Sequence, residues 1–342
     1  MKKKLFDFAI GNPPYQGDVS GNQRNKMPPV YNNFMDGAYS VATSVELITP
    51  ARFLFNAGDT PKEWNEKMLN DEHLKILMYE PDAQKVFPST GFKGGVVITV
   101  RDASKHYSPI KAFTSYPELN SLLQKIERTE NMVSFSTIIQ NRGLYRFSRE
   151  FYQDYPKAGD LLSDSRVFSG AFNRLDFAFS DVKPNDEYIG IYGLDNRTRT
   201  IKYIKKKYIV NVESLNKYKV LIPKANGSGA IGEVLSTPLI GEPLIGHTET
   251  FLTIGCFDTK NEAESCLKYV KTKFARTALG ILKITQDNTA EKWKYVPMQD
   301  FTTSSDIDWS RPIHDIDQQL YKKYGLSNDE IEFIETHVKE MD

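Results

Sequence analysis

Cysteine is scarce in this chain. Only Cys256 and Cys266 occur among 342 residues, and they form no Cys-x-x-Cys pair. A chain this poor in cysteine is not a disulfide-stabilised secreted scaffold. The five histidines, at positions 73, 106, 247, 314 and 337, show no metal-ligand spacing. We therefore expect reduced thiols, a cytoplasmic location and no metal site.

Long apolar runs and an excess of one charge are also missing. No stretch approaches the roughly 18 to 20 apolar residues that span a bilayer. The apolar run after the N-terminal lysines is too short for a secretory signal. Lys plus Arg and Asp plus Glu each number 44. A net charge of zero leaves nucleic-acid binding open, because a local basic face is sufficient for it. The length allows two ordinary domains.

The most informative segment is residues 6–16, Phe-Asp-Phe-Ala-Ile-Gly-Asn-Pro-Pro-Tyr-Gln. Its apolar first half predicts a short strand over residues 6–10. Pro13 and Pro14 fix their own φ angles, and a residue that precedes proline is held extended, as Asn12 is here. The sequence therefore predicts a stiff turn at the carboxyl end of a strand, which is where open α/β sheets bind ligands.

The residue types in this turn suit a planar base with an exocyclic amine. The side-chain carbonyl of Asn12 and the backbone carbonyl of Pro13 offer two acceptors for the two amine hydrogens, and Tyr15 offers a flat ring for stacking. Two acceptors favour a more tetrahedral nitrogen, whose lone pair can attack a sulfonium methyl group. This chemistry requires no covalent intermediate with the enzyme.

The first hundred residues alternate strand and helix signals. Further strands are predicted over residues 44–49, 74–79 and 94–100. A helix begins near residue 30, and its predicted apolar face comprises Val30, Tyr31, Phe34, Met35 and Ala38. Thr60-Pro61-Lys62-Glu63 predicts a second helix that begins with a capping box. This βαβ pattern favours a parallel sheet.

From about residue 106 the pattern becomes irregular, and basic residues interleave with aromatic ones. Residues 196–208 hold six cations in thirteen positions, namely Arg197, Arg199, Lys202, Lys205, Lys206 and Lys207. Such a run is typical of a DNA-facing strand, and also of a solvated edge strand protected by lysines. Residues 260–283 predict one long amphipathic helix, and Ser327 with Glu330 predicts a capping box for the last helix.

The Asn12-Pro13-Pro14-Tyr15 turn resembles the catalytic motif of the adenine-specific DNA methyltransferases, which methylate the exocyclic amine of adenine. Residues 45–54 are similar to the strand and turn that follow this motif in the family. Val86-Phe87-Pro88, followed by residues 94–98, is similar to the segment whose aromatic ring packs against a flipped adenine.

This resemblance implies roles for particular residues. Asn12, Pro13, Pro14 and Tyr15 match the catalytic positions, and Tyr15 and Phe87 match the rings that stack on the base. For Phe87, a position in the hydrophobic core is an open alternative. The six cations of residues 196–208 fall where the family keeps its target-recognition domain, which favours contact with double-stranded DNA.

The resemblance also implies a domain order. Residues 313–336 resemble the end of large restriction-modification methylases that carry a specificity domain. The expected fold is α/β, with a partial Rossmann-like methyltransferase sheet over residues 1–105. An α+β target-recognition domain is expected over residues 106–310, and C-terminal helices over residues 311–342.

The cofactor of the family, S-adenosylmethionine, binds a glycine-rich turn that should lie upstream of Asn12, where only eleven residues remain. The glycine-rich residues 225–233 are followed too closely by Pro238 and Pro243 for the helix that a nucleotide-binding turn needs. We therefore expect the C-terminal portion of a methyltransferase that lacks most of its cofactor site and is inactive alone. Its first strand would leave a sheet edge open, which invites pairing with the missing half or with a second copy.

Two other functions stay open at this point. One is a DNA-binding specificity module that works only with a partner chain. The other is a protein-glutamine methyltransferase, because that family also uses Asn-Pro-Pro-Tyr on an amide nitrogen. Its members usually end soon after the catalytic domain, whereas this chain continues to residue 342. The basic and aromatic content of the extension favours DNA.

Overall fold

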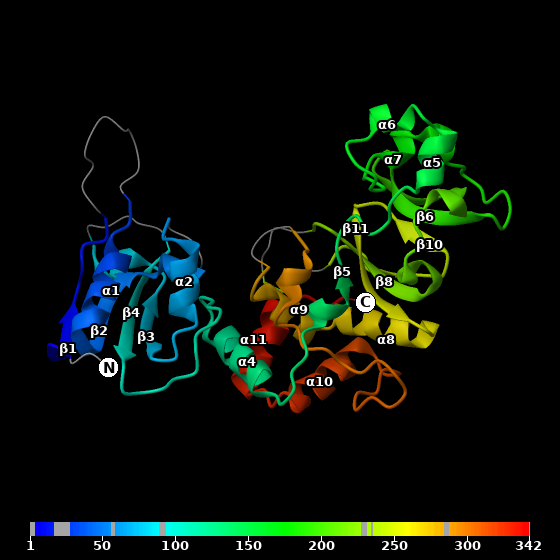
Figure 1. Ribbon diagram of the computed structural model, residues 1–342. Coiled ribbons are helices and arrows are strands. Elements are labelled where there is room, and N and C mark those ends of the chain that lie inside the picture. The colour runs from blue at the N-terminus through cyan, green and yellow to red at the C-terminus, as the bar shows by residue number, and fades with distance from the viewer. Residues whose placement is uncertain are drawn as a thin grey trace. The chain divides into compact units, whose positions relative to one another are not determined.

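The computed structural model describes residues 4–16, 28–55, 59–88, 94–226, 231–233, 235–283 and 287–341. Contacts divide the chain into two compact units, Met1–Asn120 and Ser121–Asp342, which run from blue to cyan and from green to red in Figure 1. Residues 106–120 thus lie with the first unit, and the terminal helices lie within the second. Both units mix strands and helices, and no helix among the described residues is long and apolar enough to cross a membrane.

The first unit is built on one mixed sheet. Its strands are β1 (Phe6–Gly11), β2 (Ala42–Pro50), β3 (Leu74–Glu80) and β4 (Val96–Asp102), in the spatial order β1-β2-β4-β3. Its helices are α1 (Tyr31–Val41), a 3₁₀ turn (Ala51–Phe55), α2 (Lys62–Leu69) and α3 (Ala83–Val86), and α4 (Pro117–Arg128) follows. β1 pairs parallel to β2, whereas β4 pairs antiparallel to both β2 and β3. The predicted strands are confirmed, but the sheet is mixed and not of the parallel type expected, because β4 is antiparallel to both of its neighbours.

Two local predictions in this unit need correction. The apolar stripe of α1 consists of Tyr31, Met35 and Tyr39, which are buried, whereas Phe34 is 49% exposed. The stripe follows a spacing of four residues, so Phe34 falls outside it. Helix α2 begins as predicted, but Pro61 takes the N-cap position and provides no side-chain cap. The hydroxyl of Thr60 instead donates to Oδ1 of Asn65 at 2.7 Å in the interior.

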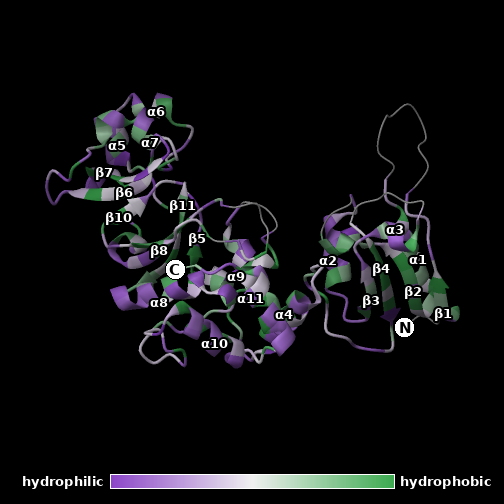
Figure 2. Ribbon diagram, turned by 180° about the vertical axis from the view of Figure 1, so that it is seen from behind, coloured by the Kyte–Doolittle hydropathy of each residue, from purple (hydrophilic) through white to green (hydrophobic). Residues whose placement is uncertain are grey.

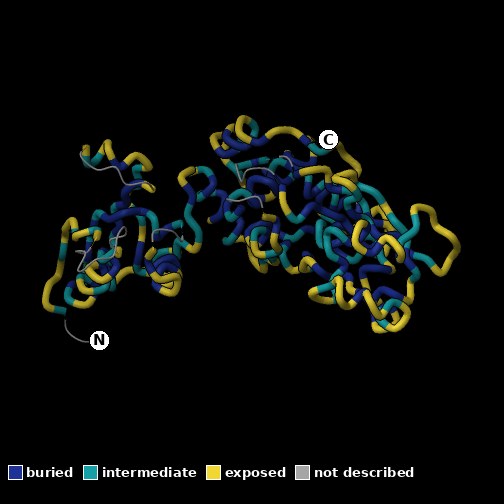
Figure 3. Tube along the Cα trace, turned by 90° about the horizontal axis from the view of Figure 1, so that it is seen from above, coloured by how far each residue is buried: buried dark blue, intermediate teal, exposed yellow. Residues whose placement is uncertain are grey.

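The core of the first unit lies on one face of the sheet, beneath α1 and α2. Its buried members include Met35 of α1, Trp64 of α2, and Val45 and Leu47 of β2. Rings pack edge to face at its centre, with the Phe53 and Trp64 centroids 5.4 Å apart. Figure 3 shows buried chain in the interior of each unit and exposed chain at its turns.

The opposite face of β1 is exposed. Phe6, Phe8 and Ile10 alternate with Asp7 and Ala9, so their side chains share one face, and they are 58%, 80% and 82% exposed. Figure 2 shows the hydrophobic colour that runs along β1. Among the described residues β1 pairs only with β2, so its other edge presents free backbone groups. An apolar strand at a free edge is a template for pairing with another chain.

The second unit holds two sheets. One has the order β10-β6-β7, and the other has the order β5-β11-β8-β9. Its strands are β5 (Ile139–Gln140), β6 (Tyr188–Asp195), β7 (Thr198–Lys205), β8 (Tyr218–Pro223), β9 (Leu239–Gly241), β10 (Ile245–His247) and β11 (Phe251–Phe257). Its helices are α5 (Arg149–Asp154), α6 (Ala158–Leu161), α7 (Ala171–Arg174), α8 (Lys260–Lys271), α9 (Lys273–Gly280), α10 (Ile313–Lys323) and α11 (Asn328–His337). Short 3₁₀ turns lie at Phe135–Ile138, Asp176–Ala178, Lys206–Tyr208, Glu213–Asn216 and Ala290–Trp293.

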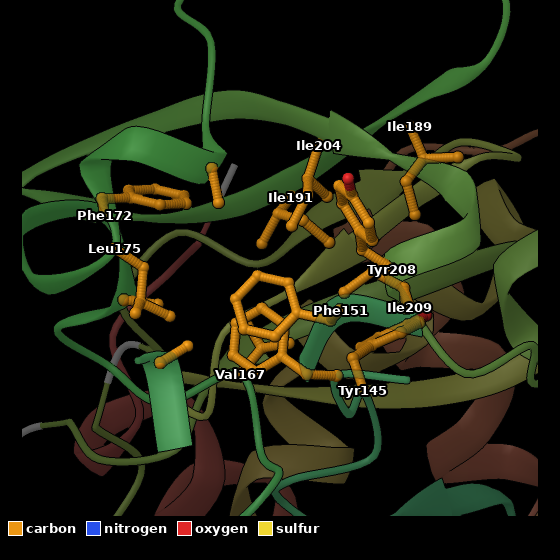
Figure 4. Close-up of a cluster of buried hydrophobic side chains, with 14 of the residues drawn as sticks. Tyr145, Phe151, Val167, Phe172, Leu175, Ile189, Ile191, Ile204, Tyr208 and Ile209 are labelled. Atoms are coloured by element: carbon orange, nitrogen blue, oxygen red, sulfur yellow. The ribbon is translucent and has the colours of Figure 1, made fainter. Parts of the chain in front are cut away.

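The core between α5, α7 and the β6–β7 hairpin is rich in aromatic rings. Phe151 and Phe147 stack with centroids 4.3 Å apart. Figure 4 shows Phe151 and Phe172 pointing toward Ile191 and Ile204 of the hairpin. This packing fixes one face of β6 and β7 against the helices.

The long helix predicted over residues 260–283 is in fact two helices, α8 and α9. Thr272 ends the first and caps the second, because its hydroxyl accepts from the Ala275 amide at 3.1 Å. The carboxylate of Asp317, from α10, accepts from the Lys273 and Phe274 amides at 3.0 and 2.9 Å. These bonds satisfy amides that a continuous helix would have used internally. The predicted capping box of α11, Ser327 with Glu330, is confirmed.

A neutral histidine is buried near the contact between β10 and β11. His247 is 2% exposed, and its Nδ1 donates to the carbonyl of Thr248 at 2.8 Å. Its Nε2 accepts from the hydroxyl of Thr253, also at 2.8 Å. Burial lowers the pKa of His247 to about 4. The imidazole therefore stays neutral in the folded protein at pH values where an exposed histidine takes up a proton.

We predict that the exposed strand β1 causes self-association of the chain. Sedimentation velocity should find dimers or larger species at micromolar concentration. Phe8→Lys should shift the population toward monomer, because it places a charge in the centre of the apolar edge. Val182→Lys is the matched control, since Val182 is also exposed (71%) but lies in the second unit. A wild-type chain that sediments as a monomer would contradict this prediction.

We also predict that His247 makes stability fall on acidification. The pKa of His247 is about 4 in the folded protein, and the ordinary histidine value of 6.5 applies to the unfolded chain. Protons therefore bind the unfolded chain preferentially between these values, and stability is lost as pH falls through this window. The loss should total about 3 kcal/mol. Urea unfolding should be measured for the wild type and for His247→Asn, which keeps a donor for the carbonyl of Thr248. Across this pH range, the free energy of unfolding should fall more steeply with decreasing pH in the wild type than in the variant. Equal slopes would show that His247 does not titrate in this way.

Candidate active site and basic strand

The carboxyl ends of three strands meet at one edge of the first sheet. β1 is parallel to β2, and β3 runs in the same direction because both β2 and β3 are antiparallel to β4. The residues that follow these strands therefore lie at the same edge. They are Asn12 after β1, the 3₁₀ turn that begins at Ala51 after β2, and the segment from Pro81 to Phe87 after β3. This edge is where an open α/β sheet binds its ligand.

The Asn12–Tyr15 segment leaves β1 as irregular chain, as predicted from its two prolines. Asn12 and Pro14 are exposed, and Pro13 and Tyr15 are partly buried. The segment is held at its far end, because the carbonyl of Tyr15 accepts from the Val30 amide at 3.2 Å, just before α1. A bridge between Gln16 and Pro29 continues this contact. The polar Asn12 is thus presented to solvent from a tethered turn.

The structure brings the two rings of the sequence hypothesis together. Tyr15 and Phe87 lie with their centroids 6.3 Å apart and their planes at 69°. Phe87 lies at the end of α3, whose first turn is capped by the Asp82 carboxylate, which accepts from the Gln84 amide. Tyr15 packs against the core of the unit, and burial raises the pKa of its phenol to about 12. Tyr15 is therefore an uncharged ring at neutral pH.

The structure adds two charged residues that sequence reasoning did not single out. Arg52 follows β2, and its side chain lies against Gly94, which precedes β4. Glu80 ends β3, accepts from the Asp82 amide at 2.9 Å and pairs with Lys85 at 3.5 Å. The available signal was their position shortly after predicted strands, since Glu80 directly follows the strand predicted over residues 74–79 and Arg52 lies just beyond the one predicted over residues 44–49. Both contribute charge to the edge that carries Asn12.

The described glycines of the first unit are Gly11, Gly37, Gly94 and Gly95. Gly11 ends β1 just before the irregular Asn12–Tyr15 segment, Gly37 lies within α1, and Gly94 and Gly95 precede β4. Part of the glycine-rich segment 225–233 lies outside the described residues, and Gly232 within it packs against Val338. Among the described residues, no two neighbouring glycines stand between a strand and the start of a helix.

The predicted basic run forms β7 and the turns at both of its ends. Arg199 donates to the carbonyls of Thr237 and Ser236, both at 3.1 Å, and lies over the ring of Phe251. Lys202 is bonded to Asp181 and Asp195 at 3.1 and 3.0 Å. These two cations stabilise the fold of the second unit. Their partners are distant in sequence or on the adjoining strand, so the run itself gave no sign of them.

The other members of the run lie at the ends of β7. Lys207 pairs with Asp154 at 2.6 Å and lies over the Tyr208 ring. Lys206 is exposed and Lys205 is partly buried. Arg197 is exposed in the turn between β6 and β7. The charge that faces solvent is therefore divided between the two ends of the strand.

Comparison with known proteins bears on the first unit. Residues 1–87 match the Eco57I restriction-modification methylase family. This segment contains β1, the Asn12–Tyr15 turn and Phe87. The chain is also 22% identical over 164 residues to an uncharacterized adenine-specific methylase of Mycoplasma pneumoniae (strain ATCC 29342 / M129 / Subtype 1). That match spans 47% of this chain and 38% of the relative, so the chain corresponds to well under half of the relative's length.

Two solved restriction-modification enzymes are similar over nearly the whole chain. The type IIG restriction endonuclease BpuSI matches with a TM-score of 0.35 and 10% identity, over 97% of this chain and 53% of that enzyme. The type IIL restriction-modification enzyme MmeI, solved in complex with DNA, matches with a TM-score of 0.31 and 9% identity, over 96% and 56%. The match to the Eco57I family is the finding that agrees with the resemblance seen in the sequence.

Proposed function

We propose that the chain is the catalytic and recognition portion of an adenine-specific DNA methyltransferase of a restriction-modification system. The observation that carries the proposal is the contact between the rings of Tyr15 and Phe87, with Asn12 in the same turn as Tyr15, at the carboxyl ends of β1 and β3. It supplies acceptors and two rings within the segment that matches the Eco57I methylases. The methyl donor would be S-adenosylmethionine, which supplies an electrophilic methyl group.

The chain's own residues would act on the acceptor amine. The side-chain carbonyl of Asn12 and the backbone carbonyl of Pro13 would each accept one hydrogen of the adenine amine, which localises the nitrogen lone pair. Pro14 keeps the Pro13 carbonyl in a fixed direction, because the residue before proline is restricted to extended geometry. Tyr15 and Phe87, which meet edge to face, would offer adjoining ring surfaces to the purine and replace part of the stacking that it loses on leaving the duplex.

Two alternatives follow from the same surfaces. A DNA-binding specificity module would use the second unit and require catalysis by a partner that pairs with the free edge of β1. A protein-glutamine methyltransferase would use Asn12 and Pro13 on a side-chain amide. A methyl donor with a radioactive methyl group distinguishes the three functions. The label enters DNA as N6-methyladenine if the chain is a DNA methyltransferase, and it enters DNA only when the partner is present if the chain is a specificity module. It enters protein if the chain is a protein-glutamine methyltransferase.

We predict that Asn12→Ala abolishes methyl transfer without loss of DNA binding. The chain should be affinity-tagged in its source cell, so that any assembly to which it belongs is assayed on unmethylated genomic DNA. Loss of one preorganised transition-state hydrogen bond should lower the rate roughly a hundred- to a thousandfold. Asn33→Ala is the matched control, because Asn33 is exposed on α1 in the same unit. A rate for Asn12→Ala within about threefold of wild type would contradict the catalytic role.

We predict that Lys205 and Lys206 bind DNA phosphates. Replacing both with Gln should weaken binding equally for all sequences. The slope of log affinity against log salt should become shallower by about 0.9 for each phosphate that is no longer bound. The control pair is Lys322→Gln with Lys339→Gln, which removes two exposed charges from the C-terminal helical region. Identical salt slopes for the wild type and the Lys205/Lys206 variant would show that these lysines only protect a strand edge.

A further inference from the structure

The β6–β7 hairpin ends in a strained two-residue turn. Asp195 pairs with Thr198, so only Asn196 and Arg197 connect the strands. Their φ angles are +46° and +67°. Positive φ at both positions is the signature of a type I′ turn, whose second position favours glycine. Arginine there has a steric cost that glycine would not have.

The strained residue is held on a rigid support. Gly193 of β6 is in close contact with the side chains of Phe172 and Thr248. A Cβ atom at position 193 would lie less than 3 Å from both side chains. Lys202 of β7 lies over the Phe172 ring at 5.9 Å and pairs with Asp195 at the base of the turn. The side-chain amide of Asn196 donates to the same carboxylate at 3.2 Å. These contacts hold both strands of the hairpin in place as far as Asp195, at the base of the turn.

The tip borders an open polar hollow. The hollow has a volume of about 440 Å³ and is lined by Ser169, Asn173, Leu194, Asn196 and Arg197. Asn173, Asn196 and Arg197 are exposed. Unlike Arg199 and Lys202, Arg197 shows no ion pair or hydrogen bond from its guanidinium to any side chain or carbonyl in the part of the chain that the structure describes. A strained backbone under an exposed arginine beside a polar hollow is the observation from which a binding role is argued.

We infer that the hairpin tip reads base edges in the DNA major groove, with Arg197 donating to O6 and N7 of a guanine. This inference rests on the proposed action on DNA. A two-stranded β-ribbon fits the major groove, and the guanidinium fork matches the two acceptors of guanine. Phosphates present only acceptors, whereas the hollow offers both amide donors and amide acceptors from Asn173 and Asn196. That mixture matches base edges, which carry both kinds of group.

The binding test uses the full chain and a pool of short duplexes with a randomised centre. The wild type should enrich a sequence with guanine at a fixed position. Arg197→Gly and Arg197→Gln should enrich the same sequence with that position relaxed, with discrimination reduced about tenfold or more. Arg311→Gln is the matched control, because it removes an exposed guanidinium whose partner is the nearby Asp308.

A second measurement removes the acceptor from the DNA instead. Replacing the preferred guanine with 7-deazaguanine should weaken wild-type binding and leave Arg197→Gly nearly unaffected, since this variant has no side-chain donor to bind N7. Arg197→Gly should also raise the melting temperature by about 2 °C, because it removes the strain of the turn. Such a variant is folded and more stable, so its reduced discrimination cannot come from unfolding.

The outcomes separate this inference from the proposed function. An unchanged sequence preference in Arg197→Gly would overturn the inference and leave DNA methylation standing. Equal weakening on all sequences with a shallower salt slope would make Arg197 a phosphate ligand and also overturn base reading. A lower melting temperature for Arg197→Gly would overturn the strain on which the inference rests. A wild-type chain that enriches no sequence would overturn sequence-specific action on DNA itself, and the inference with it.

Discussion

The candidate site depends on the parallel pairing of β1 with β2. Because these strands share a direction, and β3 joins them through the antiparallel β4, three strand ends deliver their following residues to one edge. Antiparallel pairing would place Asn12 at the opposite end of the sheet from Phe87. A register slip of one residue would turn Ala9 away from the core and bury the Phe8 face instead. The turn chemistry of residues 12–15 thus depends on a pairing made by the strand before it.

The same pairing explains why one edge of the sheet stays open. One face of β2 is covered by α1. Because β2 lies between β1 and β4, the backbone groups on both of its edges are hydrogen-bonded to a neighbouring strand. β1 has a single neighbour among the described residues and exposes Phe6, Phe8 and Ile10. Stability of the site and association through its edge are therefore linked, because both involve the six residues of β1.

In the second unit, the alternation of side chains along a strand decides which cations of the basic run are bound within the fold and which face solvent. Arg199 and Lys202 are separated by an odd number of positions, so they fall on opposite faces of β7. One meets the Phe251 ring and the other the Phe172 ring, and each finds oxygen acceptors there. The cations that face solvent are left at the ends, in the turn at Arg197 and after the strand at Lys206. A sequence count of basic residues overstates the charge that is available to a partner.

The sequence by itself determined the strands of the first unit, the stiff Asn12–Tyr15 turn and the capping box of α11, because each depends on residues within a few positions of one another. Only the tertiary structure decided the direction of β4, the break between α8 and α9, and the meeting of Tyr15 with Phe87. The break is imposed by Asp317, which lies far along the chain, while the apolar period continues through it. Local preferences determine the structure of short segments. Which strand or helix packs against which is determined by the burial of apolar faces that are distant in sequence.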